Sequence, residues 1–287
     1  MKILITGANG MLAKSVRTKL SDQELICTDV KNLDITDLKA VLEFVEQTKP
    51  EYIINCAAFT AVDKAETAGK IVEQINAEGP KNLAIAADKL GAILIHISTD
   101  YVFGGNLELS KSYKENDIKS PVTEYGRTKL LGEQAIQENT KKYYIFRTAW
   151  LYGDGNNFVK TMLKLGKLKD EINVVSDQHG SPTYAEDLAQ IIKETIEKKI
   201  PYGVYHTTNE GYTTWYDFTK AIFEKANITC KVNPVTTEEY IKMMNVEQAK
   251  RPENSQLSKE KLNSVGIEIP TWQNALDRYL EIELNVQ

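Results

Sequence analysis

The chain opens on Lys2-Ile3-Leu4-Ile5-Thr6-Gly7-Ala8-Asn9-Gly10-Met11-Leu12, where an apolar run passes into a turn with two glycines. The run predicts a strand over residues 3–6, and the residues after the turn predict a helix over 11–20. Glycine permits a sharp turn between them and lets backbone N–H groups at the helix N-terminus approach a diphosphate. We therefore predict a bound dinucleotide, contacted by Gly7, Asn9, Gly10, Met11 and Leu12.

An acidic residue follows at the distance expected for a dinucleotide site. Asp29 lies 19 residues after Gly10, at the end of the next predicted strand, where a carboxylate can bind the adenosine ribose hydroxyls. Asp29 repels a 2′-phosphate and favours NADH, whereas Lys31 can offset that repulsion, so the sequence leaves NADPH or NADH open. Further cofactor contacts are predicted for Asp34, Ile35, Ala57, Ala58, Phe59 and Thr60.

The first half of the chain alternates β-rich runs with longer amphipathic stretches. Predicted strands cover residues 3–6, 24–28, 52–57, 92–98 and 143–148. Predicted helices cover 11–20, 37–47, 71–90 and 125–138, and Thr36 or Asp34 is the expected cap of the second. This spacing predicts parallel strands joined by right-handed crossovers. The fold class is therefore α/β, a Rossmann-like doubly wound parallel sheet.

The pattern loosens after Trp150. Predicted helices there cover residues 156–165, 185–197, 214–226 and 271–280, and predicted short strands cover 172–175, 204–206 and 231–235. We predict an NAD(P)-binding domain over residues 1–150, with segments from roughly 172–208 returning to it. Residues 151–287 mainly form a smaller C-terminal substrate-binding lobe.

The bulk composition excludes several classes of partner. Of 287 residues, 42% are hydrophobic and 26% charged, the balance of a soluble globular protein, and the net charge is −5. An acidic chain does not favour nucleic acid or an anionic membrane. The three cysteines have no zinc-site spacing, so no metal is expected. A strand from residue 3 leaves no room for a signal peptide, and no apolar run is long enough to span a membrane, so the cytoplasm is expected.

Tyr125 and Lys129 are the candidates for chemistry. Four residues apart on a predicted helix, they share one face, where the ammonium would stabilise tyrosinate and lower the tyrosine pKa from about 10. Such a tyrosine can act as a general acid, although the same pair also occurs on ordinary exposed helices. Ser98 or Thr99, at the carboxyl end of a strand, can hydrogen-bond a substrate carbonyl. We interpret His96 as a core residue rather than a base.

These motifs resemble the extended short-chain dehydrogenase/reductase superfamily and, within it, the dTDP-4-dehydrorhamnose reductase family. Beyond the glycine turn, the likeness is carried by Asn55–Glu66, Ser98–Phe103, Tyr125–Lys129, Arg147–Trp150, Asp177–Thr183 and Arg251–Leu257. The resemblance implies an enzyme that uses NADPH or NADH to reduce the C4 ketone of dTDP-4-dehydro-L-rhamnose, giving dTDP-L-rhamnose.

The resemblance also implies roles for individual residues. Thr99 would position the ketone, Tyr125 would supply the proton, and Lys129 would hold the tyrosine and the nicotinamide ribose. Thr99, Asp100 and Trp150 would contact the sugar nucleotide. Arg251 would meet the substrate diphosphate or form a structural salt bridge.

Departures from the family bear on assembly and on alternative functions. Some relatives form a magnesium-bridged dimer through an acidic residue after the glycine turn, where this chain has Lys14-Ser15, so a monomer or metal-free homodimer is expected. An epimerase or dehydratase of the same fold is the first alternative, but dehydrating relatives carry Asp-Glu where this chain has Asp100-Tyr101. A non-catalytic regulatory subunit is the second, although such subunits can retain Thr99, Tyr125 and Lys129.

Overall fold

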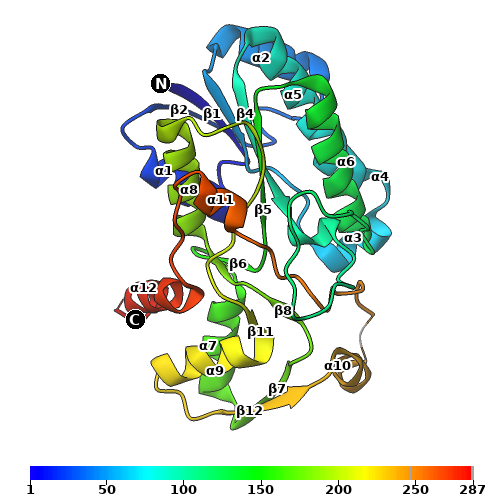
Figure 1. Ribbon diagram of the computed structural model, residues 1–287, viewed down its shortest axis with the longest axis vertical. Coiled ribbons are helices and arrows are strands. Elements are labelled where there is room, and N and C mark those ends of the chain that lie inside the picture. Colours follow the sequence, from blue (N-terminus) through cyan, green and yellow to red (C-terminus); the bar gives the residue numbers. More distant parts are fainter. Residues whose placement is uncertain (246, 286–287) are drawn as a thin grey trace.

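The computed structural model describes residues 1–245 and 247–285, which form a larger and a smaller lobe (Figure 1). The larger lobe holds a six-stranded sheet of order β10-β5-β4-β3-β1-β2, in which every pairing is parallel. Its strands are β1 (Lys2–Thr6), β2 (Glu24–Thr28), β3 (Tyr52–Asn55), β4 (Ile93–Thr99), β5 (Tyr143–Thr148) and β10 (Gly203–His206). The predicted doubly wound α/β fold is confirmed, with its switch point between β1 and β3.

Helices cover both faces of this sheet. One face packs against α1 (Met11–Lys19) and α8 (Ala185–Lys198), and the other against α2 (Leu38–Thr48), α5 (Gly79–Leu90) and α6 (Glu124–Asn139). Side chains of β1 alternate between the two cores: Ile3 and Ile5 lie in the first, and Leu4 in the second. Burial on both faces explains why the strands read as continuous apolar runs.

Several boundaries differ from the sequence prediction. The cap of α2 is Asp37, whose Oδ1 accepts hydrogen bonds from two first-turn N–H groups, and not Thr36 or Asp34. The long helix predicted over residues 71–90 is α4 (Lys70–Glu73), a π-helical turn (Gln74–Glu78) and α5. The π turn brings the backbone of Asn76 against α6, where a Cβ on Gly132 would lie 2.2 Å from the Asn76 carbonyl oxygen. Periodicity missed α3 (Val62–Ala68), α10 (Thr237–Met244) and α11 (Glu260–Ser264).

The smaller lobe has a separate aromatic core. It contains α7 (Phe158–Leu168), α9 (Trp215–Lys225) and α12 (Trp272–Asn285), with β7 (Glu171–Val175) parallel to β12 (Lys231–Val235). Short ladders pair β6 (Leu151–Tyr152) with β9 (Thr183–Tyr184), and β8 (His179–Gly180) with β11 (Thr213–Thr214). Of the segment 172–208, α8 and β10 lie on the large sheet, whereas β7 pairs within the smaller lobe.

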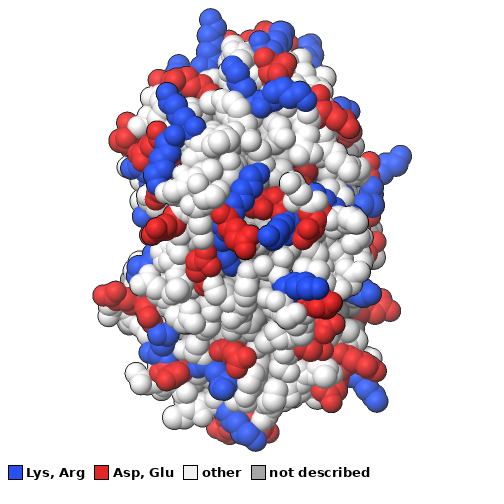
Figure 2. Space-filling view, in the orientation of Figure 1, with Lys and Arg blue, Asp and Glu red and all other residues white. Residues whose placement is uncertain are grey.

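Charged side chains are interspersed on the surface. On the face shown in Figure 2, lysine and arginine alternate with aspartate and glutamate over both lobes. Among the described residues, none of the helices has both the length and the apolar character that crossing a bilayer requires.

Candidate active site

The glycine turn packs against the end of β3. Gly7 has φ +64°, and a Cβ at this position would lie 2.7 Å from Cα of Ala57. Gly10 begins α1 without any side-chain hydrogen bond to the first turn, which leaves those N–H groups to a ligand. A helix N-terminus held open in this way, beside backbone too close for a side chain, fits a diphosphate.

Replacing Gly7 with Ala is therefore expected to reduce both stability and cofactor affinity. Positive φ costs about 1 kcal/mol for alanine, and the clash with Ala57 adds about 1–3 kcal/mol. Gly91→Ala is the control, because Gly91 has φ +76° and an added Cβ would meet only Lys142 Nζ, at 3.8 Å. Urea unfolding and cofactor titration should show the larger loss for Gly7→Ala; equal losses would mean that the close approach to Ala57 has no consequence.

A cavity beside the turn collects the residues predicted to hold the adenosine end of the cofactor. Its lining includes Gly7, Asn9, Gly10, Asp29, Asp34, Ile35, Ala57 and Ala58. The Asn9 amide donates to the Asp29 carboxylate, whose other oxygen accepts the Lys31 N–H at 3.0 Å. Phe59 does not line this cavity: the Asn76 side chain, held in the π turn, pairs with its N–H and carbonyl at 2.8 and 3.1 Å.

A second cavity continues from the first and shares Gly10, Cys56 and Ala58 with it. The predicted residues on its wall are Gly10, Met11, Leu12, Ala58, Thr60, Thr99, Asp100, Tyr125, Lys129 and Trp150. The structure therefore brings the glycine turn together with the predicted catalytic residues at the carboxyl edge of the sheet.

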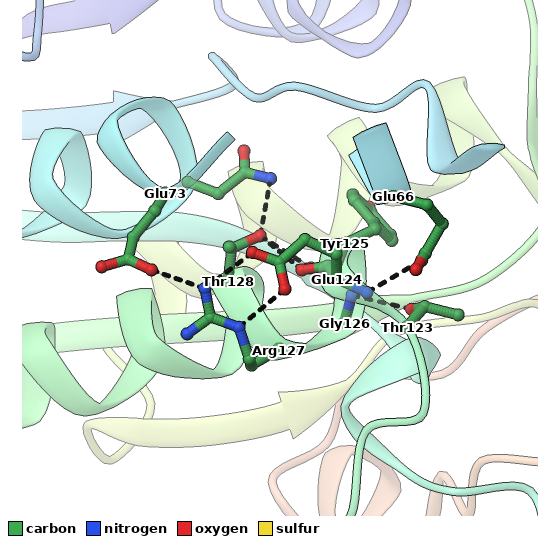
Figure 3. A network of polar contacts seen from close by, with 9 residues as sticks. Glu66, Glu73, Thr123, Glu124, Tyr125, Gly126, Arg127 and Thr128 are labelled. Atoms are coloured by element: carbon green, nitrogen blue, oxygen red, sulfur yellow. Dashed lines mark hydrogen bonds and ion pairs between the residues drawn. The ribbon is translucent and has the colours of Figure 1, made fainter. Parts of the chain in front are cut away.

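Local contacts fix the helix end that carries Tyr125. Thr123 caps α6 by accepting the Gly126 N–H at 3.0 Å, and Glu66 of α3 accepts the Glu124 N–H at 2.9 Å. Arg127 extends the network to Glu124 and to Glu73 (Figure 3). These contacts, from segments distant in sequence, set the start of the helix and with it the position of Tyr125.

The charge state of the Tyr125/Lys129 pair differs from the prediction. Burial raises the pKa of Tyr125 well above its usual value, and a hydrogen bond with Thr99 only partly opposes that rise. Burial also lowers the pKa of Lys129 to about 8. Lys129 Nζ donates to the Ile97 carbonyl at 2.6 Å and lies 3.2 Å from His96 Nε2. Burial of Tyr125 therefore dominates over the lowering by Lys129 that the sequence predicts, and the amine is itself engaged with the Ile97 carbonyl of β4.

Asp100 is a buried carboxyl group on the same wall. Burial raises its pKa to about 6, and hydroxyl groups of Ser255 and Thr99 act in the opposite direction. Thr99 Oγ1 donates to Asp100 Oδ1 at 2.9 Å, whereas Oδ2 accepts no hydrogen bond of ordinary geometry, from Ser255 or any other described residue. A buried acceptor without a partner is costly, and a substrate hydroxyl would satisfy it.

This carboxyl group predicts a pH-dependent stability. The folded-state pKa of about 6 lies above the ordinary 3.8, so protonated Asp100 stabilises the fold at low pH, and that contribution is lost as the pH rises through 6. Asp100→Asn should therefore raise the free energy of unfolding by about 2–3 kcal/mol near pH 8, and the gain should shrink as the pH falls through 6 and vanish below about pH 3. Urea unfolding across this range tests it, with Asp88→Asn, an exposed carboxylate on α5, as control. A pH-independent effect would contradict it.

A third cavity adjoins the second where the two lobes meet. The two share Val62, Tyr101, Trp150 and Trp215. Trp150, at φ +49°, stacks on Trp215 with ring centroids 3.7 Å apart. Arg251 also lines it, but its guanidinium pairs with both carboxylate oxygens of Asp63, at 2.7 and 2.8 Å, and donates to Tyr101 Oη at 3.3 Å.

Sequence reasoning missed several residues of these walls. Tyr101 follows Asp100 directly and meets Tyr125 edge to face at 5.6 Å between centroids, so its position at a strand end was an available signal. Trp215 comes from the smaller lobe, and nothing local in the sequence connects it to the site. Lys14, which follows the glycine turn, pairs with Asp154 of the smaller lobe's first loop at 2.7 Å.

Known proteins share this arrangement over nearly the whole chain. Residues 1–284 match the family model described as RmlD substrate binding domain. The chain is 41% identical to the dTDP-4-dehydrorhamnose reductase of Aggregatibacter actinomycetemcomitans, with 96% of this chain and 97% of that protein covered.

Two solved structures extend the similarity to three dimensions. A dTDP-4-dehydrorhamnose reductase from Clostridium acetobutylicum is 47% identical, with a TM-score of 0.93 over 99% of this chain and 100% of that chain. The dTDP-4-dehydrorhamnose reductase from Bacillus anthracis in complex with NADP is 41% identical, with a TM-score of 0.92 over 98% and 99% of the two chains. This chain therefore belongs to the dTDP-4-dehydrorhamnose reductase family, oxidoreductases of the extended short-chain dehydrogenase/reductase superfamily.

Proposed function

We propose that this protein reduces the C4 ketone of dTDP-4-dehydro-L-rhamnose to dTDP-L-rhamnose. The observation that carries the proposal is the second cavity. The start of α1 lines this cavity together with Thr99, Tyr125 and Lys129. A dinucleotide that lies along the first cavity with its diphosphate at Gly10 would reach these side chains with its other end. The relatives that carry this function by name match nearly all of the chain.

The proposed cofactor is NADPH or NADH. When bound, it supplies a hydride for the carbonyl carbon. Asp29, held by Asn9 and the Lys31 N–H, presents a carboxylate for the ribose hydroxyls, whereas the Lys31 side chain lies close enough in sequence to favour a 2′-phosphate. The NADP complex of the Bacillus anthracis relative supports inclusion of NADPH.

Tyr125 is the proposed proton donor. Its raised pKa keeps the hydroxyl protonated at neutral pH, so a proton is available, but it also makes Tyr125 a weaker acid than one whose pKa lies near the working pH. Thr99 lies beside it and can donate a second hydrogen bond to that oxygen once its hydroxyl turns from Asp100. Two donors aimed at one oxygen stabilise the negative charge that develops as hydride reaches the carbon.

The substrate end of the site is proposed to lie in the third cavity. The stacked rings of Trp150 and Trp215 give a flat apolar wall for the nucleotide sugar. Asp100 Oδ2, on the adjoining wall of the second cavity, gives an acceptor for a sugar hydroxyl. Arg251 can reach a diphosphate only if it gives up part of its pairing with Asp63. The residue after Asp100 is Tyr101. The chain therefore lacks, next to Asp100, the glutamate that the dehydratase alternative would require.

The test uses the purified full chain with dTDP-4-dehydro-L-rhamnose generated in situ, and NADPH and NADH absorbance followed in parallel. Cofactor oxidation with dTDP-L-rhamnose as product is expected, and the two rates rank the cofactors. Product formed without net cofactor consumption would instead indicate an epimerase. No oxidation, despite demonstrated cofactor binding, would indicate another sugar nucleotide or a regulatory subunit.

A further inference from the structure

A glycine lies against the aromatic wall of the third cavity. Gly180 is the second residue of β8 and belongs to the Asp177–Thr183 motif. A Cβ at this position would lie 2.9 Å from Cε2 and Cζ2 of the Trp150 indole and 3.3 Å from its Nε1, closer than the roughly 3.5–4.0 Å at which carbon atoms pack. The ring of Trp150 therefore occupies the space that a side chain at position 180 would need.

The backbone of Gly180 is held from both sides. On one side β8 pairs antiparallel with β11, where Gly180 is opposite Thr213. On the other side, the His179 N–H donates to the Glu253 carbonyl at 2.8 Å, and the Ser255 N–H donates to the His179 carbonyl at 2.7 Å. The strand therefore cannot move away from the indole to make room for a side chain without breaking these hydrogen bonds.

The Trp150 ring is confined as well. Its backbone has φ +49°, which non-glycine residues rarely adopt, and its carbonyl accepts the Thr183 N–H at 3.2 Å. One face of the ring stacks on Trp215, with centroids 3.7 Å apart and planes at 15°, and Phe158 packs against Trp215 at 4.3 Å between centroids. A side chain at position 180 would therefore turn the ring off Trp215 and into the cavity that both tryptophans line.

We propose that Gly180 is a positioning residue: because it has no side chain, Trp150 can lie flat on Trp215 and present the surface that binds the sugar of the nucleotide sugar. The inference rests on the proposed function and names how the substrate of that site is held. The β8–β11 ladder that fixes Gly180 also fixes Trp215, which directly follows Thr214 at the end of β11. One pair of strands thus sets both neighbours of the indole, whose flat apolar surface suits the C–H face of a sugar.

The first test reads the stacking of the two rings and uses no substrate. Stacked indoles couple electronically and give an exciton couplet in the far-ultraviolet circular dichroism spectrum. The chain has three tryptophans, and the third, Trp272, packs edge to face against Phe218. We expect a couplet in the unmodified protein, its loss in Trp215→Phe, and a clear reduction in Gly180→Ala. An unmodified protein without a couplet, or an undiminished couplet in Gly180→Ala, would overturn the proposal.

The control for this spectrum is Gly266→Ala. Gly266 has φ +79°, so alanine is strained there, but an added Cβ would have no atom within 4 Å. This variant should lose stability and keep the couplet, because it displaces no aromatic ring.

A second substitution tests the clash itself. Gly180→Ala should lose less stability when it is combined with Trp150→Phe, since phenylalanine lacks the fused part of the indole that meets position 180. Equal losses in the two backgrounds, measured by urea unfolding, would contradict the proposal. If Gly180→Ala alone does not fold, the combined variant should fold, and its failure to do so would also contradict the proposal.

The last test measures the sugar contact. Calorimetric titration compares dTDP-L-rhamnose with dTDP, which lacks the sugar, on the unmodified protein, Gly180→Ala and Gly266→Ala. Gly180→Ala should weaken binding of dTDP-L-rhamnose by about tenfold, the order expected for one lost aromatic contact, and leave binding of dTDP unchanged. Equal weakening of both ligands, or of neither, would show that the position of the ring does not serve the sugar. Failure of the proposed reduction is distinguishable, because it would appear as absent turnover of the unmodified protein.

Discussion

Tyr125→Phe should lower kcat by about 10²- to 10⁴-fold, the usual contribution of a positioned general acid. The phenyl ring keeps the edge-to-face contact with Tyr101 and leaves the glycine turn intact, so cofactor affinity should be largely retained. The raised pKa of Tyr125 means that the hydroxyl starts protonated, so its loss removes a proton donor and not a base. Turnover with dTDP-4-dehydro-L-rhamnose and fluorescence titration of the cofactor measure the two effects separately.

Tyr143→Phe is the matched control for this experiment. Tyr143 is the first residue of β5, and Thr148, which lines the second cavity, is the last. The loss of a hydroxyl at Tyr143 should therefore leave turnover unchanged. If Tyr125→Phe kept full turnover, the proton would have to come from another hydroxyl on this wall. Tyr101 is then the residue to replace next, because it also lines the cavity.

Glu133→Gln should destabilise the fold by about 3–5 kcal/mol, because it leaves a buried guanidinium without its counter-charge. Arg147 donates to both oxygens of Glu133, at 2.9 and 2.7 Å, and both side chains are 2% exposed. Ser98 Oγ also donates to Glu133, at 2.5 Å. Urea unfolding of the variant and of the unmodified protein measures the difference in free energy of unfolding.

Glu73→Gln applies the same substitution to an exposed ion pair. Glu73 binds Arg127 at 2.5 Å in the network of Figure 3, but both side chains are 45% exposed. Solvent screening limits the value of such a pair to about 0–1 kcal/mol. Similar losses for Glu133→Gln and Glu73→Gln would show that burial does not set the energy of these ion pairs.

Short-range patterns predicted much of the framework. The strands Glu24–Thr28 and Tyr143–Thr148 begin and end where the sequence predicts. In the central strand Tyr143–Thr148 the run Tyr143–Phe146 is apolar because helices cover both faces of the sheet there. Helix ends were less well predicted, as the Asp37 cap shows, since several nearby polar residues could serve. The π turn at Gln74–Glu78 has no local signal, because it forms where Asn76 packs against α6.

The features of the candidate site also differ in whether local sequence could predict them. The sequence by itself determined the glycine turn between β1 and α1 and the shared helix face of Tyr125 and Lys129, because both depend on backbone geometry over a few residues. Only the tertiary structure decided the charge states of that pair, the stacking of Trp215 on Trp150 and the pairing of Arg251 with Asp63. The physical reason is that a pKa depends on solvation and on neighbours, and the fold supplies both from segments far apart in the chain.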